Sequence, residues 1–244
     1  MKNKKSTEQL KALNHKLFLA QAKARRRSEP QLERRKPILE EKPVMLIYCE
    51  GENTEPSYFN KFKIASLSVE SFGEGHNTKS LVKRAIQLSS MKHYERIWCV
   101  FDADPIPGNK NRSRDFNESI KLAERNGFGV AYSNQAFEYW LLLHFEDHQG
   151  GKLERAQYGP RINSYINKFG VTYDYQGSKI VSQEFYNLLM QPDEKIKSQN
   201  GKRRVRLALR RAEKIFNMYD HLSPAREESS TTVFKLVKEL LKYK

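Results

Sequence analysis

The sequence predicts an α/β fold, in which a mainly parallel sheet is flanked by helices and followed by a helical C-terminal region. Short apolar runs rich in strand formers recur along the first part of the chain, each followed by a segment with a helical pattern. Strands and helices that alternate at this spacing form right-handed crossovers, which build parallel sheets. Beyond Gly150 only helical patterns follow. We therefore expect an arm at residues 1–43, an α/β core at residues 44–150, and a helical region at residues 151–244 packed on that core.

The core is predicted to contain four strands, each with a helix after it. The strands are expected at residues 44–49, 67–72, 96–101 and 128–133, and the helices at residues 55–66, 78–94, 115–126 and 135–145. The first strand is apolar throughout and the third is apolar after Arg96, as is typical of strands buried on both faces of a parallel sheet. Pro56 suits the first turn of its helix, and Gly127 suits the end of another. Further helices are expected at residues 153–169, 178–190, 203–219 and 231–243.

Positive charge is concentrated in two segments of the chain. The formal net charge is +15, from 44 basic and 29 acidic residues. Residues 1–43 hold 13 Lys and Arg against 5 Asp and Glu, and residues 195–214 hold 9 against 1. Such an excess favours polyanionic partners, because binding them releases counterions. We therefore expect the chain to bind nucleic acid, with simple solvation of the basic stretches as the alternative.

The sequence contains no sign of a membrane or secreted protein. No apolar stretch approaches the ~18–20 residues that span a bilayer, and the basic N-terminus lacks the apolar segment of a secretory signal. Cys49 and Cys99 each lie inside an apolar run, where a small core residue is expected rather than a disulfide or a metal ligand. We expect a cytoplasmic protein. The arm should be partly disordered or helical, and a helix would fall at about residues 10–27.

Three acidic residues directly follow predicted strands. Glu50 comes after the first strand, and Asp102 and Asp104 come after the third. Ligands collect at the carboxyl ends of parallel strands, and neighbouring strands lie ~4.8 Å apart, so these acids can converge if the two strands are close. Carboxylate oxygens suit Mg²⁺ or Mn²⁺. We predict that these three residues bind the metal and act in catalysis, the simpler alternative being ordinary turn formation after strands.

Three motifs in order resemble the RloB family. They are Cys49-Glu-Gly-Glu-Asn-Thr-Glu-Pro56, the turn Phe101-Asp-Ala-Asp104, and Asn134-Gln-Ala-Phe-Glu-Tyr-Trp-Leu-Leu-Leu-His-Phe145. Val44-Met-Leu-Ile-Tyr-Cys-Glu50-Gly51, followed by Ile97-Trp-Cys-Val-Phe-Asp102-Ala-Asp104, also resembles the TOPRIM arrangement, a Rossmann-like fold, of topoisomerases, bacterial primases and OLD-type nucleases. The resemblance covers about residues 44–146. It implies a TOPRIM-like fold with Glu50, Asp102 and Asp104 as metal ligands, and a role in bacterial defence against phage beside a partner ATPase.

Other acidic residues near these motifs are secondary candidates. Glu138 lies in the first turn of a predicted helix, where it is either a catalytic ligand or base, or a charge that compensates the helix dipole. Glu52 and Glu55 follow the first strand, and as loop acids they are expected to be exposed and solvated.

Two groups of basic residues are candidates for nucleic-acid binding. The first group lies beside the Asp-x-Asp turn, where substrate phosphates would approach: Lys110, Arg112 and Arg114. The second group shares one face of a predicted C-terminal helix: Arg203, Arg206 and Arg210. Such a face can follow a nucleic-acid backbone. The alternative is that it contacts an acidic protein or a second copy of the chain.

These patterns together favour a metal-dependent nuclease that hydrolyses phosphodiester bonds of DNA or RNA. A topoisomerase would need a further tyrosine-bearing domain, and a primase would bring zinc-ribbon cysteines that the sequence lacks. The alternative is an interaction protein on a TOPRIM-like scaffold, which binds nucleic acid or an ATPase without cutting.

Overall fold

The computed structural model describes residues 7–28, 42–104, 110–148, 151–192 and 203–243. The chain forms two units, Met1–Glu41 and Lys42–Lys244. The first unit contains helix α1 (Thr7–Ser28), on which apolar side chains such as Leu17 and Phe18 are more than half exposed. All the other described elements belong to the second unit. Within the described ranges, no helix is long and apolar enough to cross a bilayer.

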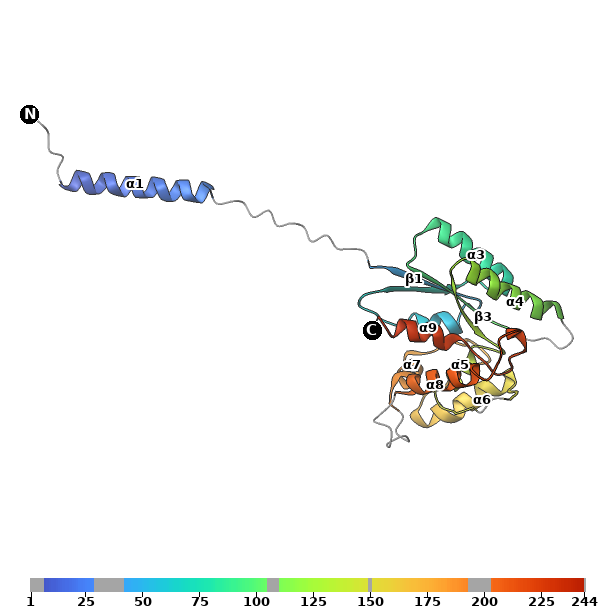
Figure 1. Ribbon diagram of the computed structural model, residues 1–244. Helices are drawn as coiled ribbons and strands as arrows, with labels where there is room; N and C mark the ends of the chain where they lie inside the picture. The colour runs from blue at the N-terminus through green and yellow to red at the C-terminus, as the bar shows by residue number, and fades with distance from the viewer. Residues whose placement is uncertain (1–6, 29–41, 105–109, 149–150, 193–202, 244) are drawn as a thin grey trace, which may run out of the picture. The chain divides into compact units, whose positions relative to one another are not determined.

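Four parallel strands form the sheet, in the order β2-β1-β3-β4 (Figure 1). They are β1 (Val44–Cys49), β2 (Ser68–Gly73), β3 (Arg96–Asp102) and β4 (Gly129–Ser133). The predicted α/β fold with its parallel sheet is therefore confirmed. Strand β1 pairs directly with β3, so the two strands that precede the acidic residues are neighbours.

A helix follows each strand of the core, and hydrogen bonds to residues distant in sequence limit two of these helices. They are α2 (Thr54–Phe59), α3 (Thr78–Met91), α4 (Lys110–Arg125) and α5 (Glu138–Leu142). Helix α2 is shorter than the prediction of residues 55–66, because the Asn60 side chain bonds both backbone groups of Ser71 on the edge strand β2. Helix α5 is also shorter than predicted, because Asn134 bonds Ser230 and Pro224 in the C-terminal region instead of capping a helix.

The C-terminal region is attached to the free edge of β4. Its helices are α6 (Arg155–Ile166), α7 (Gln183–Met190), α8 (Arg204–Phe216) and α9 (Val233–Leu240), with short 3-10 turns at Asn167–Phe169 and Pro224–Arg226. Just before α9, the backbone of Thr232 donates to the Tyr132 carbonyl at 2.8 Å, and its hydroxyl accepts from the Tyr132 N–H at 2.8 Å. These buried bonds satisfy backbone groups of β4 that would otherwise be unpaired.

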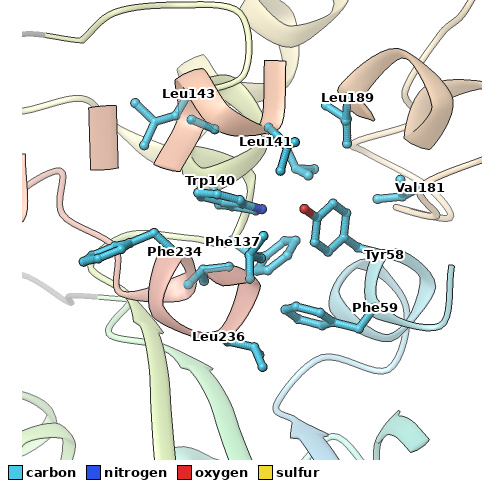
Figure 2. Close-up of a cluster of buried hydrophobic side chains, with 14 of the residues drawn as sticks. Tyr58, Phe59, Phe137, Trp140, Leu141, Leu143, Val181, Leu189, Phe234 and Leu236 are labelled. Atoms are coloured by element: carbon cyan, nitrogen blue, oxygen red, sulfur yellow. The ribbon is translucent and has the colours of Figure 1, made fainter. Parts of the chain in front are cut away.

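Alternate residues of the central strands pack on opposite faces of the sheet. Leu46 and Tyr48 face the cluster that α3 and α4 complete, whereas Met45 and Ile47 face a larger cluster shared with the C-terminal helices. Figure 2 shows part of that larger cluster, with side chains from α2, α5, α7 and α9 around Trp140. The core and the C-terminal region therefore share one hydrophobic interior.

The two cysteines are buried and free, as the sequence predicts. Cys49 belongs to the cluster on one face of the sheet and Cys99 to the cluster on the other. Both are therefore packing residues, and the sheet separates them.

Candidate functional site

A cavity of about 390 Å³ lies at the carboxyl ends of β1 and β3. Six acidic residues line it: Glu50, Glu52, Glu55, Asp102, Asp104 and Glu138. Three basic residues line it as well: Arg112, Arg155 and Lys179. The cavity therefore brings the sequence-predicted acids together with cationic side chains from the C-terminal region.

Glu50 and Asp102 are fixed beside each other by the pairing of β1 with β3. The Glu50 N–H donates to the Val100 carbonyl at 2.8 Å, which continues the strand pairing by one residue. The Asp102 N–H donates to Oε2 of Glu50 at 3.1 Å, and Oδ2 of Asp102 accepts from the Phe137 N–H at 3.2 Å. Each carboxylate thus accepts one backbone hydrogen bond, which favours its charged form.

Glu55 is buried at the start of α2, with only 5% of its surface exposed. The expectation that it is an exposed, solvated loop acid is therefore wrong. Burial, together with the nearby charges of Glu138 and Glu50, raises the pKa of Glu55 to about 7. A side chain on Gly51 would have its Cβ 2.4 Å from Oε2 of Glu55, so the absence of a side chain there makes room for this carboxylate.

Glu138 forms another wall of the cavity. It is 8% exposed and is the first residue of α5. The Tyr173 hydroxyl donates to its Oε1 at 3.1 Å and lies 3.5 Å from the Thr54 hydroxyl. A side chain from the C-terminal region thus positions Glu138 within the cavity. Its place at the start of α5 also lets its charge compensate the dipole of that short helix.

The acidic residues disfavour one another's charge. Loss of hydration raises the pKa of Asp102 well above its usual range, and the charges of Glu55 and Glu138 raise it further. Desolvation also raises the pKa of Glu50. Like charges in a site of low hydration have this effect because each ionised group opposes ionisation of the next. An approaching cation would relieve that repulsion.

The carboxylate of Asp104 forms ion pairs with two arginines. Nη2 of Arg112 lies 2.9 Å from Oδ2 of Asp104, and Nη1 of Arg155 lies 3.2 Å from Oδ1. Within the described residues, no three Asp, Glu, His or Cys side chains form a ready-made metal site. The structure places Glu50, Asp102 and Asp104 in one cavity, and their binding of a metal stays a prediction.

A comparison with protein-family models gives a match that covers most of the chain. A family model described as RloB-like protein matches residues 45–240. The chain belongs to the RloB-like protein family. Neither a curated protein nor a solved structure matches it. The matched range runs from β1 to the end of α9. The RloB-like unit therefore includes the C-terminal region that supplies Arg155 and Lys179 to the cavity.

The predicted nucleic-acid-binding residues occupy different places in this RloB-like fold. Arg112 lines the acidic cavity, whereas Arg114 is exposed on α4 and lies 3.8 Å from Glu118. Lys110 begins α4, but its side chain lies outside the described residues.

The second basic group consists of three exposed arginines, one at the N-cap of α8 and two within the helix: Arg203, Arg206 and Arg210. Arg203 and Arg206 line a separate groove of about 520 Å³ with Lys238 and Lys242. Their neighbour Arg204 is buried and donates to the Leu188 carbonyl at 2.9 Å, so it has a structural role.

The sequence analysis missed two basic residues that line the cavity and the tyrosine that donates to Glu138. Arg155, Tyr173 and Lys179 come from the C-terminal region, and no local pattern connects them with the acidic motifs. A signal did exist for Glu55, because it opens a helix immediately after the strand that carries Glu50, and such a helix begins at the carboxyl edge of the sheet.

Proposed function

We propose that this RloB-like protein is a metal-dependent nuclease, with its catalytic centre in the acidic cavity. The observation that carries this proposal is the combination of buried carboxylates and rim cations in one cavity at the carboxyl edge of a parallel sheet. Carboxylates bind a divalent cation, and the cations bind the phosphates of the substrate. In a site that bound only an acidic ligand, the carboxylates would repel that ligand.

The donors in the cavity fit Mg²⁺ or Mn²⁺. All the candidate ligands are oxygens, as these hard cations require. Burial raises the pKa values of Asp102 and Glu55, and repulsion from neighbouring acids, which a cation would reduce, raises them further. We assign the metal to Asp102 and Glu50, with Asp104 and Glu138 as further ligands. When bound, the ion polarises the phosphoryl oxygen and makes water more acidic. Glu55, with a pKa of about 7 in the metal-free cavity, is suited to accept the proton of the attacking water.

The biological setting is part of the same proposal. The resemblance of the motifs to RloB and OLD-type proteins supports a role in bacterial defence against phage, as the effector beside a partner ATPase. The exposed arginines of α8 would contribute affinity for DNA or RNA without sequence preference, since phosphate contacts carry no sequence information.

A cleavage assay on single- and double-stranded DNA and RNA tests this function. We expect cleavage with Mg²⁺ or Mn²⁺, no cleavage in EDTA, and more than ~100-fold loss of rate in Asp102→Ala, because the metal supplies most of the charge stabilisation. Asp115→Ala on α4 is the matched control and should cut normally, since Asp115 lies outside the cavity and faces Lys79 at 3.9 Å. Undiminished cleavage by Asp102→Ala would contradict the proposal.

One observation favours a second function, that of a binding protein that does not cut. The carboxylate of Asp104 is already engaged by two arginines, and the described residues contain no ready-made metal site. A protein of this kind would bind nucleic acid equally well with EDTA and with Mg²⁺, and Asp102→Ala would bind as the wild type does. Divalent-cation binding measured by calorimetry separates the two functions even if cleavage needs a partner.

A further inference from the structure

Two arginines from separate helices converge on the carboxylate of Asp104. Arg112 belongs to α4 and Arg155 is the first residue of α6. Each arginine donates to a different oxygen of Asp104, at 2.9 Å and 3.2 Å. We call Arg112 and Arg155 the arginine pair. Two guanidinium groups that share one anion form the kind of site that binds carboxylate and phosphate alike.

Each arginine of the pair also interacts with groups other than the Asp104 carboxylate. Nε of Arg112 donates to the Ala103 carbonyl at 3.3 Å, which fixes the guanidinium group against the backbone of the turn. The charges of Asp102 and Glu138, as well as that of Asp104, act on Arg155. The attraction of these arginines to the cavity therefore does not depend on Asp104 alone.

The carboxylate of Asp104 is bound by the arginine pair in a way that another anion could replace. Its φ of +40° lies in the left-handed region that non-glycine residues seldom adopt. Its side chain is 44% exposed, and those of Arg112 and Arg155 are 34% and 45% exposed. A ligand from solvent can therefore reach both guanidinium groups, and exposed ion pairs of this kind are individually weak.

We propose that the arginine pair is a phosphate-binding site, occupied by Asp104 in the absence of substrate and by a backbone phosphate of nucleic acid when substrate is bound. The identity of the ligand rests on the proposed nuclease function. A tetrahedral phosphate offers oxygens to both guanidinium groups at once, as the carboxylate does, and it carries its charge on more oxygens. Lys179 lines the same cavity, and within the described residues its ammonium group has no ion-pair partner. The cavity thus offers a third cation to the same anion.

Isothermal titration of the full chain with inorganic phosphate in EDTA tests the proposal. Removing the competing carboxylate with Asp104→Asn should strengthen phosphate binding about ten-fold, the effect of one charge-assisted hydrogen bond. The double variant Asp104→Asn/Arg155→Ala should lose that gain. Controls on α4 that make the same changes of charge are Asp115→Asn and Arg125→Ala, and neither should alter phosphate binding.

The proposal is overturned if Asp104→Asn binds phosphate no more tightly than Asp115→Asn does, or if the gain survives Arg155→Ala. Should Asp104→Asn fail to fold by circular dichroism, Asp104→Gly makes the same comparison, because glycine accepts a positive φ. The measurement needs neither metal nor cleavage. The expected phosphate-binding changes in a protein that binds no divalent cation by calorimetry would therefore refute the proposed function alone, and metal-dependent cleavage without the gain would refute this inference alone.

Discussion

The buried carboxylate of Glu55 should make the metal-free protein less stable as the pH rises. Its pKa is raised from 4.5 to about 7, chiefly by burial. Because each pKa unit corresponds to ~1.4 kcal/mol, this difference is equivalent to about 3 kcal/mol of folding free energy. The folded state holds the proton more tightly than the unfolded state does, so the stabilisation is complete below pH ~4.5 and is lost as the pH rises through about 7.

Replacement of Glu55 by Gln isolates this effect, since Gln keeps the shape and cannot ionise. Urea unfolding in EDTA should show little difference between Glu55→Gln and the wild type at pH 5. At pH 8 the variant should be more stable by about 3 kcal/mol. Glu52→Gln is the matched control, because Glu52 lines the same cavity but is exposed, and it should leave stability unchanged at both pH values. A Glu55→Gln variant no more stable than the wild type at pH 8 would refute the reasoning.

Three further predictions concern the C-terminal region. Thr232→Val removes the hydroxyl that accepts from the Tyr132 N–H and should destabilise the fold by about 1–3 kcal/mol in urea unfolding, whereas Thr232→Ser should be nearly neutral; equal losses would contradict the assignment. Tyr173→Phe removes the donor to Glu138 and should change the affinity for Mn²⁺ without unfolding the protein, so unaltered Mn²⁺ calorimetry would exclude Glu138 as a ligand that this bond positions. The third prediction concerns the exposed basic group Arg203, Arg206 and Arg210. Alanine at all three positions should reduce the slope of log K against log salt for duplex DNA binding by up to ~0.9 per lost phosphate contact. An unchanged slope would favour an acidic protein as the partner of these residues.

The parts of the fold that depend on local patterns could be predicted from the sequence. The apolar runs before Glu50 and Asp102 predict buried parallel strands, and these strands are neighbours in the sheet. Helix ends were less predictable. Helix α2 ends early because Asn60 pairs with the backbone of Ser71, and α5 begins late because Asn134 pairs with the C-terminal segment. Both depend on contacts that only the folded chain creates.

The same distinction applies to the cavity. Its acids follow strands, so strand order and the rule for carboxyl edges bring them together. The orientation of each acid depends on residues distant in sequence. Arg155 lies 51 residues after Asp104, which it contacts, and Tyr173 lies 35 residues after Glu138. The burial of Glu55, which decides its pKa, likewise depends on packing that no motif reveals.

A crystal soaked with Mn²⁺ and measured for anomalous scattering tests the central claim most directly. The account predicts an anomalous peak inside the acidic cavity, within ~2.5 Å of a carboxylate oxygen of Asp102. Asp102→Ala crystals should lack the peak, and Asp115→Ala crystals should keep it. No peak in the cavity at saturating Mn²⁺, or a peak that Asp102→Ala retains, would contradict the claim that these carboxylates form a metal centre.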